Sequence, residues 1–145
     1  MRRDRTQTQI LDELYKTSRM GMEASEIMLP RVHDEELRGQ IKRQDETYIN
    51  TMERAHAMLR QMGKEPAGVS RTAQGMLRSS VRMNTLLDRS PRHLANLMIK
   101  GSTLGIVNMT SALNRSPDDG TQVHRLAEGY IGAEEKNIDR LKKFL

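Results

Sequence analysis

A single carboxylate, Glu134, stands on the apolar face of the last amphipathic segment of the chain. At 100° per residue it falls near the centre of the stripe that carries Leu126 and Leu141, and Asn137 lies beside it. A buried carboxylate needs a metal, a cation or hydrogen bonds, because an unpaired buried charge is very costly. Glu134 therefore predicts either a site in the protein core or a structural carboxyl group held by hydrogen bonds.

The segment 34–62 supplies polar groups that could face Glu134. Tyr48 lies on its apolar face, Gln44 points into the same face, and Asp45 lies at its edge. We predict that these three side chains and Asn137 converge on Glu134 as a polar cluster in the core. We favour a structural glutamate tied to Tyr48 or Gln44, and keep a functional site in the bundle core as the alternative.

The remaining candidates for metal binding are weaker. Glu53 and His56 form a Glu-x-x-His motif, which di-iron bundles use for ligation. Because Glu53 points about 130° from the centre of the apolar face, we interpret the two residues as a solvated surface pair and a weak metal candidate. The other histidines lie near predicted helix starts, where we expect surface or capping groups; they are His33, His93 and His124. Of these, His33 and His93 would share one end of a ferritin-like bundle.

Several kinds of chemistry are excluded by composition and motif. The chain has no cysteine, which rules out disulfides, thiol nucleophiles and cysteine-based zinc sites. It also has no glycine-rich phosphate loop and no serine nucleophile elbow. We therefore lean away from an enzyme and predict no cofactor, with iron in a ligand-poor site as the alternative.

The elements that must position these residues are helices. With 145 residues, 36% of them hydrophobic and 30% charged, the chain suits one domain of the all-α class. Start and stop signals predict helices at about 6–29, 34–62, 70–88, 91–114 and 117–144. The signals are a capping box at Thr6, an acidic start at Asp34, a stop at Gly63, and Ser-Pro starts at Ser90 and Ser116.

Loop lengths then predict the topology. Short turns make 6–29 and 34–62 one antiparallel hairpin, and 91–114 and 117–144 another. The connection between them contains the helix 70–88, which at 1.5 Å per residue covers about 27 Å and can traverse the whole bundle. Two hairpins joined by one long crossover form the ferritin-like four-helix bundle, and an irregular five-helix bundle is the alternative.

Small residues mark one predicted contact between helices. Ser18, Gly21 and Ser25 lie in the middle of 6–29, with Glu23 on the opposite side, and 101–105 reads Gly-Ser-Thr-Leu-Gly. We expect close packing of these two stretches, with a cofactor-sized gap as the alternative. Leu97, Leu104 and Val107 lie on another side of 91–114, where the crossover helix or a second copy of the chain would cover them.

The positive charge is concentrated in the crossover. Residues 66–100 hold six basic residues against one acidic residue, a net charge equal to the +5 of the whole chain. Arg71, Arg78, Arg82 and Arg89 align within about 20° on a helix. Met76, Leu77 and Leu87 lie opposite them. This basic amphipathic pattern predicts either a packed helix with its arginines in water, which we favour, or a surface for anionic membranes or nucleic acid.

Three stretches of the chain resemble a family of small bacterial ferritin-like proteins of unknown function. They are the segments 83–88 (MNTLLD), 100–106 (KGSTLGI) and 134–143 (EEKNIDRLKK). The resemblance implies a helical bundle, and in the wider superfamily carboxylate and histidine ligands for two irons. At the corresponding positions this chain has Asp45 with Tyr48 and Glu134 with Asn137, so both histidines are replaced. The segment 91–114 also has no carboxylate.

The role expected from the sequence is non-catalytic. We predict an interaction or structural protein with a degenerate metal site, self-associating through 91–114 or the crossover helix. An anionic partner for the arginines and a ligand-poor metal enzyme are the alternatives. The segment 94–113 has the length of a membrane span, but its polar residues favour a core helix. No secretory signal follows Met1–Arg5, so we expect no transmembrane span and a cytoplasmic protein.

Overall fold

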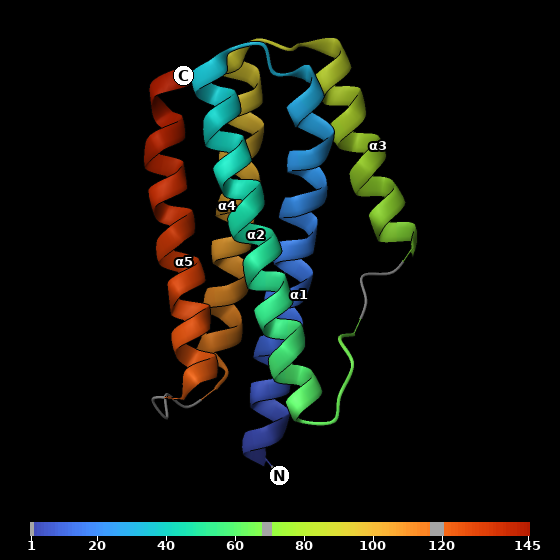
Figure 1. Ribbon diagram of the computed structural model, residues 1–145, viewed down its shortest axis with the longest axis vertical. Helices are drawn as coiled ribbons and strands as arrows, with labels where there is room; N and C mark the ends of the chain where they lie inside the picture. The colour runs from blue at the N-terminus through green and yellow to red at the C-terminus, as the bar shows by residue number, and fades with distance from the viewer. Residues whose placement is uncertain (1, 68–70, 117–120) are drawn as a thin grey trace.

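A computed structural model describes residues 2–67, 71–116 and 121–145, with the side chains of 2–4, 71–74 and 86 left undescribed. These residues form five α-helices and no strand (Figure 1): α1 (Arg2–Met28), α2 (Glu35–Gln61), α3 (Arg71–Leu87), α4 (Pro91–Asn114) and α5 (Gln122–Leu141). Short 3-10 turns, Leu29–Arg31 and Lys142–Phe144, follow α1 and α5. The predicted all-α class is confirmed.

Local sequence explains where the middle helices begin and end. Asp34 caps α2 by accepting a hydrogen bond from the N–H of Leu37 at 2.8 Å. Ser90 caps α4 in the same way, accepting from the N–H of His93 at 3.2 Å. Gly63 follows α2 with a φ of 72°, the left-handed conformation that glycine adopts at little cost.

Two predicted helix starts differ from the structure. The capping box at Thr6 is wrong, because α1 already begins at Arg2 and Thr6 lies inside the helix. The start expected at Ser116 falls largely on 117–120, outside the described residues. The described helix α5 begins at Gln122, where Thr121 accepts a hydrogen bond from the N–H of His124 at 3.3 Å.

The helices run lengthwise and alternate in direction (Figure 1). From the N-terminus at the lower end, α1 ascends and α2 descends beside it. The helix α3 ascends along the outside of α1, α4 descends, and α5 ascends to the C-terminus. The pairs α1–α2 and α4–α5 are therefore antiparallel hairpins, and α3 returns the chain along the length of the bundle between them. None of the described helices carries an apolar stretch that could cross a membrane.

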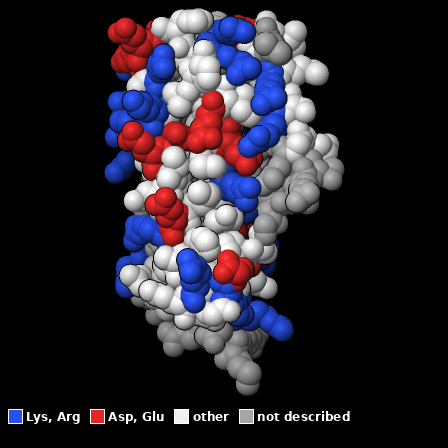
Figure 2. Space-filling model, turned by 45° about the vertical axis from the view of Figure 1, so that its right-hand side comes forward, with Lys and Arg blue, Asp and Glu red and all other residues white. Residues whose placement is uncertain are grey.

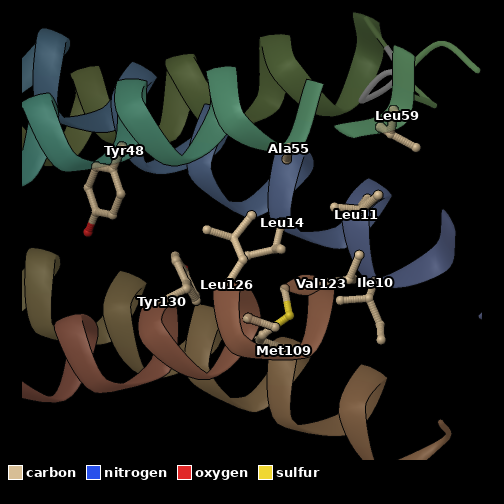
Figure 3. Close-up of a cluster of buried hydrophobic side chains, with 11 residues drawn as sticks. Ile10, Leu11, Leu14, Tyr48, Ala55, Leu59, Met109, Val123, Leu126 and Tyr130 are labelled. Carbon is tan, nitrogen blue, oxygen red and sulfur yellow. The ribbon is translucent and has the colours of Figure 1, made fainter. Parts of the chain in front are cut away.

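The apolar core is divided into two clusters. One lies toward the lower end and includes Ile10, Leu14, Leu59, Met109 and Leu126, with Tyr48 and Tyr130 at one edge (Figure 3). The other includes Met28, Leu37, Ile41, Leu94 and Leu141. Buried polar side chains of α2, α4 and α5 share the core with these clusters, among them Gln40, Gln44, Ser102, Glu134 and Asn137. The polar cluster is thus an internal part of the bundle.

The packing of α3 corrects a predicted apolar face. Met76 and Leu87, expected to pack inward, are 68% and 81% exposed. Thr85 is buried instead, and Val81 packs against the second apolar cluster. The reason is that α3 lies outside the other helices and buries a narrow strip of its surface. The helix also leaves Leu104 and Val107 of α4 exposed, so the expectation that it covers them is wrong for these two residues, whereas Leu97 is partly buried against the second apolar cluster, as is Val81 of α3. Cover by a second copy stays a prediction.

Candidate functional site

Glu134 of α5 lies at the centre of a buried hydrogen-bond network and is 2% exposed. The hydroxyl of Tyr48, from α2, lies 2.9 Å from Oε1 and 3.0 Å from Oε2. Asn137 donates to Oε1 at 2.8 Å, one turn further along α5. Tyr130, one turn earlier, points its hydroxyl at Oε2 at the longer distance of 3.5 Å. All three side chains act as donors toward the carboxylate.

A second layer of amides orients these donors. Gln44 donates to the Tyr48 hydroxyl at 3.3 Å. Gln40 donates to the oxygen of Gln44 at 2.9 Å and to the oxygen of Asn137 at 3.2 Å. The exposed Arg43 donates to the Gln40 oxygen at 3.0 Å. The side-chain oxygens of Gln40, Gln44 and Asn137 therefore each accept a hydrogen bond, and the side-chain NH2 groups of these residues each donate at least one. The last donors in this network, Tyr48 and Asn137, donate to Glu134.

Burial and hydrogen bonding act in opposite directions on Glu134. Burial raises the pKa of this carboxyl group above its ordinary value, and the hydrogen bonds from Asn137 and Tyr48 oppose that rise. Burial and the nearby charge of Glu134 also raise the pKa of the Tyr48 and Tyr130 hydroxyls. Both tyrosines consequently stay protonated and keep donating. Within the described residues no Lys, Arg or His forms an ion pair with Glu134.

Two glycines make room for the tyrosines. A Cβ atom added at Gly21 of α1 would lie 2.9 Å from the ring of Tyr48. A Cβ atom added at Gly105 of α4 would overlap the hydroxyl of Tyr130. The small residues noted in the sequence therefore accommodate the tyrosines that bind Glu134.

A cavity of about 180 Å³ lies beside this network, between α1, α3 and α4. Its walls are mostly apolar and include Met20, Met28, Leu77, Val81 and Met98. Tyr48, Ser102, Tyr130 and Glu134 also line it. The lining residues Ser80, Gly101 and Leu104 are exposed, which places the opening between α3 and α4. Of the small residues, Gly21 and Gly105 line this cavity, whereas Ser18 and Ser25 are fully buried and do not line it. The expected close packing is therefore interrupted by a gap beside the glycines.

Ser102 is an unpartnered polar group in this cavity. Its side chain is 2% exposed, and its Oγ forms no hydrogen bond with any described residue. The hydroxyl nevertheless lies close enough to Glu134 and Tyr48 to oppose part of the rise that burial causes in the pKa of both groups. A ligand that reaches the carboxylate therefore meets a second group able to form a hydrogen bond.

The structure joins four of the five residues of the predicted polar cluster. Gln44, Tyr48, Glu134 and Asn137 share the network described above. Asp45 lies apart from them on α2, and its Oδ1 is buried without a hydrogen-bond partner among the described residues. Burial raises the pKa of Asp45 to about 6, helped by the charges of Glu26 and Glu46. The expectation that Asp45 converges on Glu134 is wrong, because its side chain faces this acidic neighbourhood.

The weaker metal candidates remain dispersed. Glu53 is exposed, and His56 pairs through Nε2 with Glu65 at 3.3 Å. His33 is exposed and His93 contacts the backbone oxygen of Asn84 at 3.0 Å, while the N–H of the buried His124 is capped by Thr121.

The donor set around Glu134 does not fit a di-iron centre. The described residues contain no grouping of three or more His, Cys, Asp or Glu side chains that could hold a metal. Neither Tyr48 nor Asn137 is a histidine, and both already donate hydrogen bonds to Glu134, so they contribute no ligand pair of the kind that di-iron bundles use.

Gln40 and Glu23 are among the buried polar residues that the sequence alone did not predict. Gln40 precedes Gln44 by one helical turn, and that spacing on the apolar side of α2 was the available signal. Glu23 was placed on the outward side of α1, yet it is 4% exposed because α3 covers that side. It lies 3.4 Å from Arg19 and 3.8 Å from Arg78 of α3. The arginine four residues earlier was a usable signal for the first of these pairs.

Comparison with known proteins gives no match to this chain. Neither a family model, nor a curated protein, nor a solved structure is similar to it. The function is therefore argued from the geometry of the cavity and of the network behind it.

Proposed function

We propose that this chain is a non-catalytic binding protein that holds a small, mostly apolar molecule in the cavity between α1, α3 and α4. The polar end of that molecule would meet Glu134. The observation that carries the proposal is the meeting of an apolar cavity with a buried carboxylate that has no basic partner among the described residues.

The size of the cavity agrees with such a ligand. An engineered cavity of about 150 Å³ in another protein stays dry and binds benzene. The cavity here measures about 180 Å³, so a single ring with a short polar substituent is a suitable size. Methionine side chains adapt to the shape of a ligand because they are unbranched and polarizable.

The polar network supports binding better than catalysis. A general acid or base works best when its pKa lies near the working pH. Burial keeps the Tyr48 and Tyr130 hydroxyls protonated, and both point at Glu134. These groups hold one carboxylate in a fixed position, which suits recognition of a donor on a ligand.

The ferritin-like assignment belongs to the same proposal. The helices α1, α2, α4 and α5 run up, down, down and up (Figure 1), the directions that two hairpins with one long crossover produce. In this view α3 is a helical crossover, and Glu134 is the remnant of a carboxylate site whose histidines have been replaced.

Methionine methyl signals provide the test of binding. In protein labelled with ¹³C at the methionine methyl groups, toluene or benzyl alcohol should shift the signals of Met20, Met28 and Met98, which line the cavity. The signals of Met58 and Met62, which pack against the lower apolar cluster, should stay in place. Equal shifts of all methionines, or none at saturating ligand, would refute the proposal.

A matched pair of variants locates the binding. Gly101 lines the cavity, whereas Gly129 of α5 is exposed and lines a separate hollow beside α2, and an added Cβ atom meets nothing within 4 Å at either position. Gly101→Leu should fill part of the cavity and abolish the methyl shifts. Gly129→Leu adds the same side chain elsewhere and should leave them unchanged.

A second candidate function is docking of α3 on an anionic membrane. Met76, Met83 and Leu87 are 65–81% exposed on this helix, together with Arg82, and the exposed Arg89 follows two residues after its end. Apolar side chains next to cations favour binding to a lipid surface. Nucleic acid is a less suitable partner, because α3 has no aromatic residue on which a base could stack. Acidic side chains also lie between the basic ones on this side of the molecule (Figure 2), which reduces its attraction for anions and makes this the second candidate.

The four arginines of the predicted basic stripe have different surroundings, and Arg89 lies beyond the end of α3 at Leu87. The side chain of Arg71 lies outside the described residues. Arg78, expected in water, lies 3.8 Å from the buried Glu23, so Arg82 and Arg89 are the better probes. Replacing both with glutamate should abolish co-sedimentation with phosphatidylserine vesicles at low salt. Equal sedimentation of wild type and variant, or none by either, would remove this candidate.

A further inference from the structure

The described residues that line the cavity include a negatively charged side chain and no positively charged one. Glu134 is the one carboxylate among the described residues that line the cavity, and none of those residues is Lys, Arg or His. The guanidinium of Arg43 reaches Glu134 only through Gln40 and further side chains of the network. An ionised Glu134 therefore leaves the cavity with a formal charge of −1 and no facing cation.

The hydrogen-bonding capacity of Glu134 is only partly used. Oε1 accepts at 2.8 Å from Asn137 and lies 2.9 Å from the Tyr48 hydroxyl. That hydroxyl has a single proton, so it serves one of the two carboxylate oxygens at a time. The other contact of Oε2 among the described residues is the 3.5 Å approach of Tyr130. Oε2 thus retains room for a short hydrogen bond from a ligand.

Two further oxygens at the cavity wall can accept hydrogen bonds. The Ser102 Oγ is buried and has no partner among the described residues. The hydroxyl of Tyr130 points its proton toward Glu134 and keeps its lone pairs for another donor. Together with Oε2 these atoms offer three acceptors, which is the number of N–H donors on an ammonium group. The walls also carry the rings of Tyr48 and Tyr130, whose faces attract cations.

We propose that the ligand of this cavity is a protonated primary amine on a small apolar body, bound by an ion pair with Glu134. This inference rests on the proposed function and names its ligand class. A carboxylate ligand is repelled by Glu134, and a neutral hydroxyl satisfies one acceptor where an ammonium satisfies three. The amine also supplies the positive charge that the cavity lining lacks, so the buried carboxylate is paired when the ligand is bound.

Four benzene derivatives of similar size test the inference on the full chain: toluene, benzyl alcohol, benzylamine and benzoate. Their dissociation constants are measured from the methyl shifts of Met20 and Met98 at neutral pH, where benzylamine is protonated. Because hydrogen bonds to charged groups are worth about twice those between neutral groups, we expect benzylamine to bind at least about tenfold more tightly than benzyl alcohol. Benzoate should bind more weakly than toluene.

The Glu134→Gln variant separates charge from shape. Benzylamine should fall to the affinity of benzyl alcohol in this variant, while the affinity for toluene should change less than about twofold. If the variant does not fold, Ser102→Ala serves in its place and should lower the affinity for benzylamine severalfold, with toluene unchanged. An unchanged affinity for benzylamine in the variant that folds would overturn the inference.

The outcomes with wild-type protein distinguish the two proposals. If toluene and benzyl alcohol bind but benzylamine binds no more tightly, the amine inference is overturned and the binding cavity stands. If none of the probes shifts the cavity methionines, the proposed function fails, and the inference that rests on it fails too. Tight binding of benzylamine together with loss in Glu134→Gln supports both.

Discussion

The seating of Tyr130 over Gly105 predicts opposite effects for two similar glycine-to-alanine substitutions in α4. Alanine is more favourable than glycine in the middle of a helix by about 0.8–1 kcal/mol. At Gly101 an added Cβ atom meets nothing within 4 Å, so Gly101→Ala should gain most of that amount. At Gly105 the same atom overlaps the Tyr130 hydroxyl, so the ring has to move.

The cost at Gly105 is estimated from what Tyr130 loses. Inserting a methyl group into a filled site costs about 1–3 kcal/mol. Moving Tyr130 also removes its contact with the buried Glu134, and a hydrogen bond of that kind contributes about 1 kcal/mol. After the gain in helix propensity, Gly105→Ala should lower the free energy of unfolding by about 2 kcal/mol. The two variants should therefore differ by about 3 kcal/mol.

Urea unfolding followed by circular dichroism measures this difference, and a double-mutant cycle identifies its cause. In Tyr130→Phe the overlapping hydroxyl is absent, and the next atom of the ring, Cζ, would lie 3.3 Å from the new Cβ. Adding Gly105→Ala to Tyr130→Phe should cost at least about 1 kcal/mol less than adding it to wild type. Additive effects, or stabilisation by Gly105→Ala equal to that by Gly101→Ala, would contradict the placement of Tyr130.

Three other predictions concern the remaining charged groups. Burial raises the pKa of Asp45 from 3.8 to about 6, so its contribution to stability is fully present below pH 3.8 and is lost as the pH rises through about 6. Asp45→Asn should therefore stabilise the protein at pH 8 by about 1 kcal/mol, once the shift is discounted for partial exposure, and should not stabilise it at pH 3.5. An equal gain in stability at both pH values would contradict this. Arg78→Glu should lower the free energy of unfolding in urea by about 1–2 kcal/mol, because Arg78 lies 3.8 Å from the buried Glu23. The exposed control Arg82→Glu should change it by less than about 0.5 kcal/mol. Equal effects of the two substitutions would refute the pairing of Arg78 with Glu23. Protein purified with iron supplied should hold no stoichiometric iron by elemental analysis, because the side chains around Glu134 are donors already bonded to it; about two metals per chain, lost in Glu134→Ala, would show that a metal site exists.

The helical class and most of the polar cluster could be predicted because both follow from periodicity. Glu134, Tyr48 and Gln44 lie on apolar faces, and positions 100° apart fix that relation whatever the neighbouring helices do. The prediction for Asp45 was wrong because this residue lies at the edge of the apolar face of α2. At an edge, the neighbour decides which way a side chain turns, and the acidic neighbourhood of Glu26 is not visible from the periodicity of α2.

The cavity and the position of α3 could not be derived from periodicity. The apolar and basic stripes of α3 were both visible in the sequence, but the pattern does not determine how much of the surface of the helix is buried. Val81 and Thr85 face the bundle while Met76 and Leu87 face solvent, because α3 packs along the outside of the other helices. The same placement buries Glu23, which the periodicity of α1 alone assigns to the surface.

The most direct test of the binding site is a crystal structure of the protein soaked with benzylamine. We expect the aromatic ring in the cavity between α1, α3 and α4, among Met20, Leu77 and Met98, with the nitrogen within hydrogen-bond distance of Glu134. A cavity filled by the surrounding side chains, or benzylamine bound elsewhere on the protein, would contradict it.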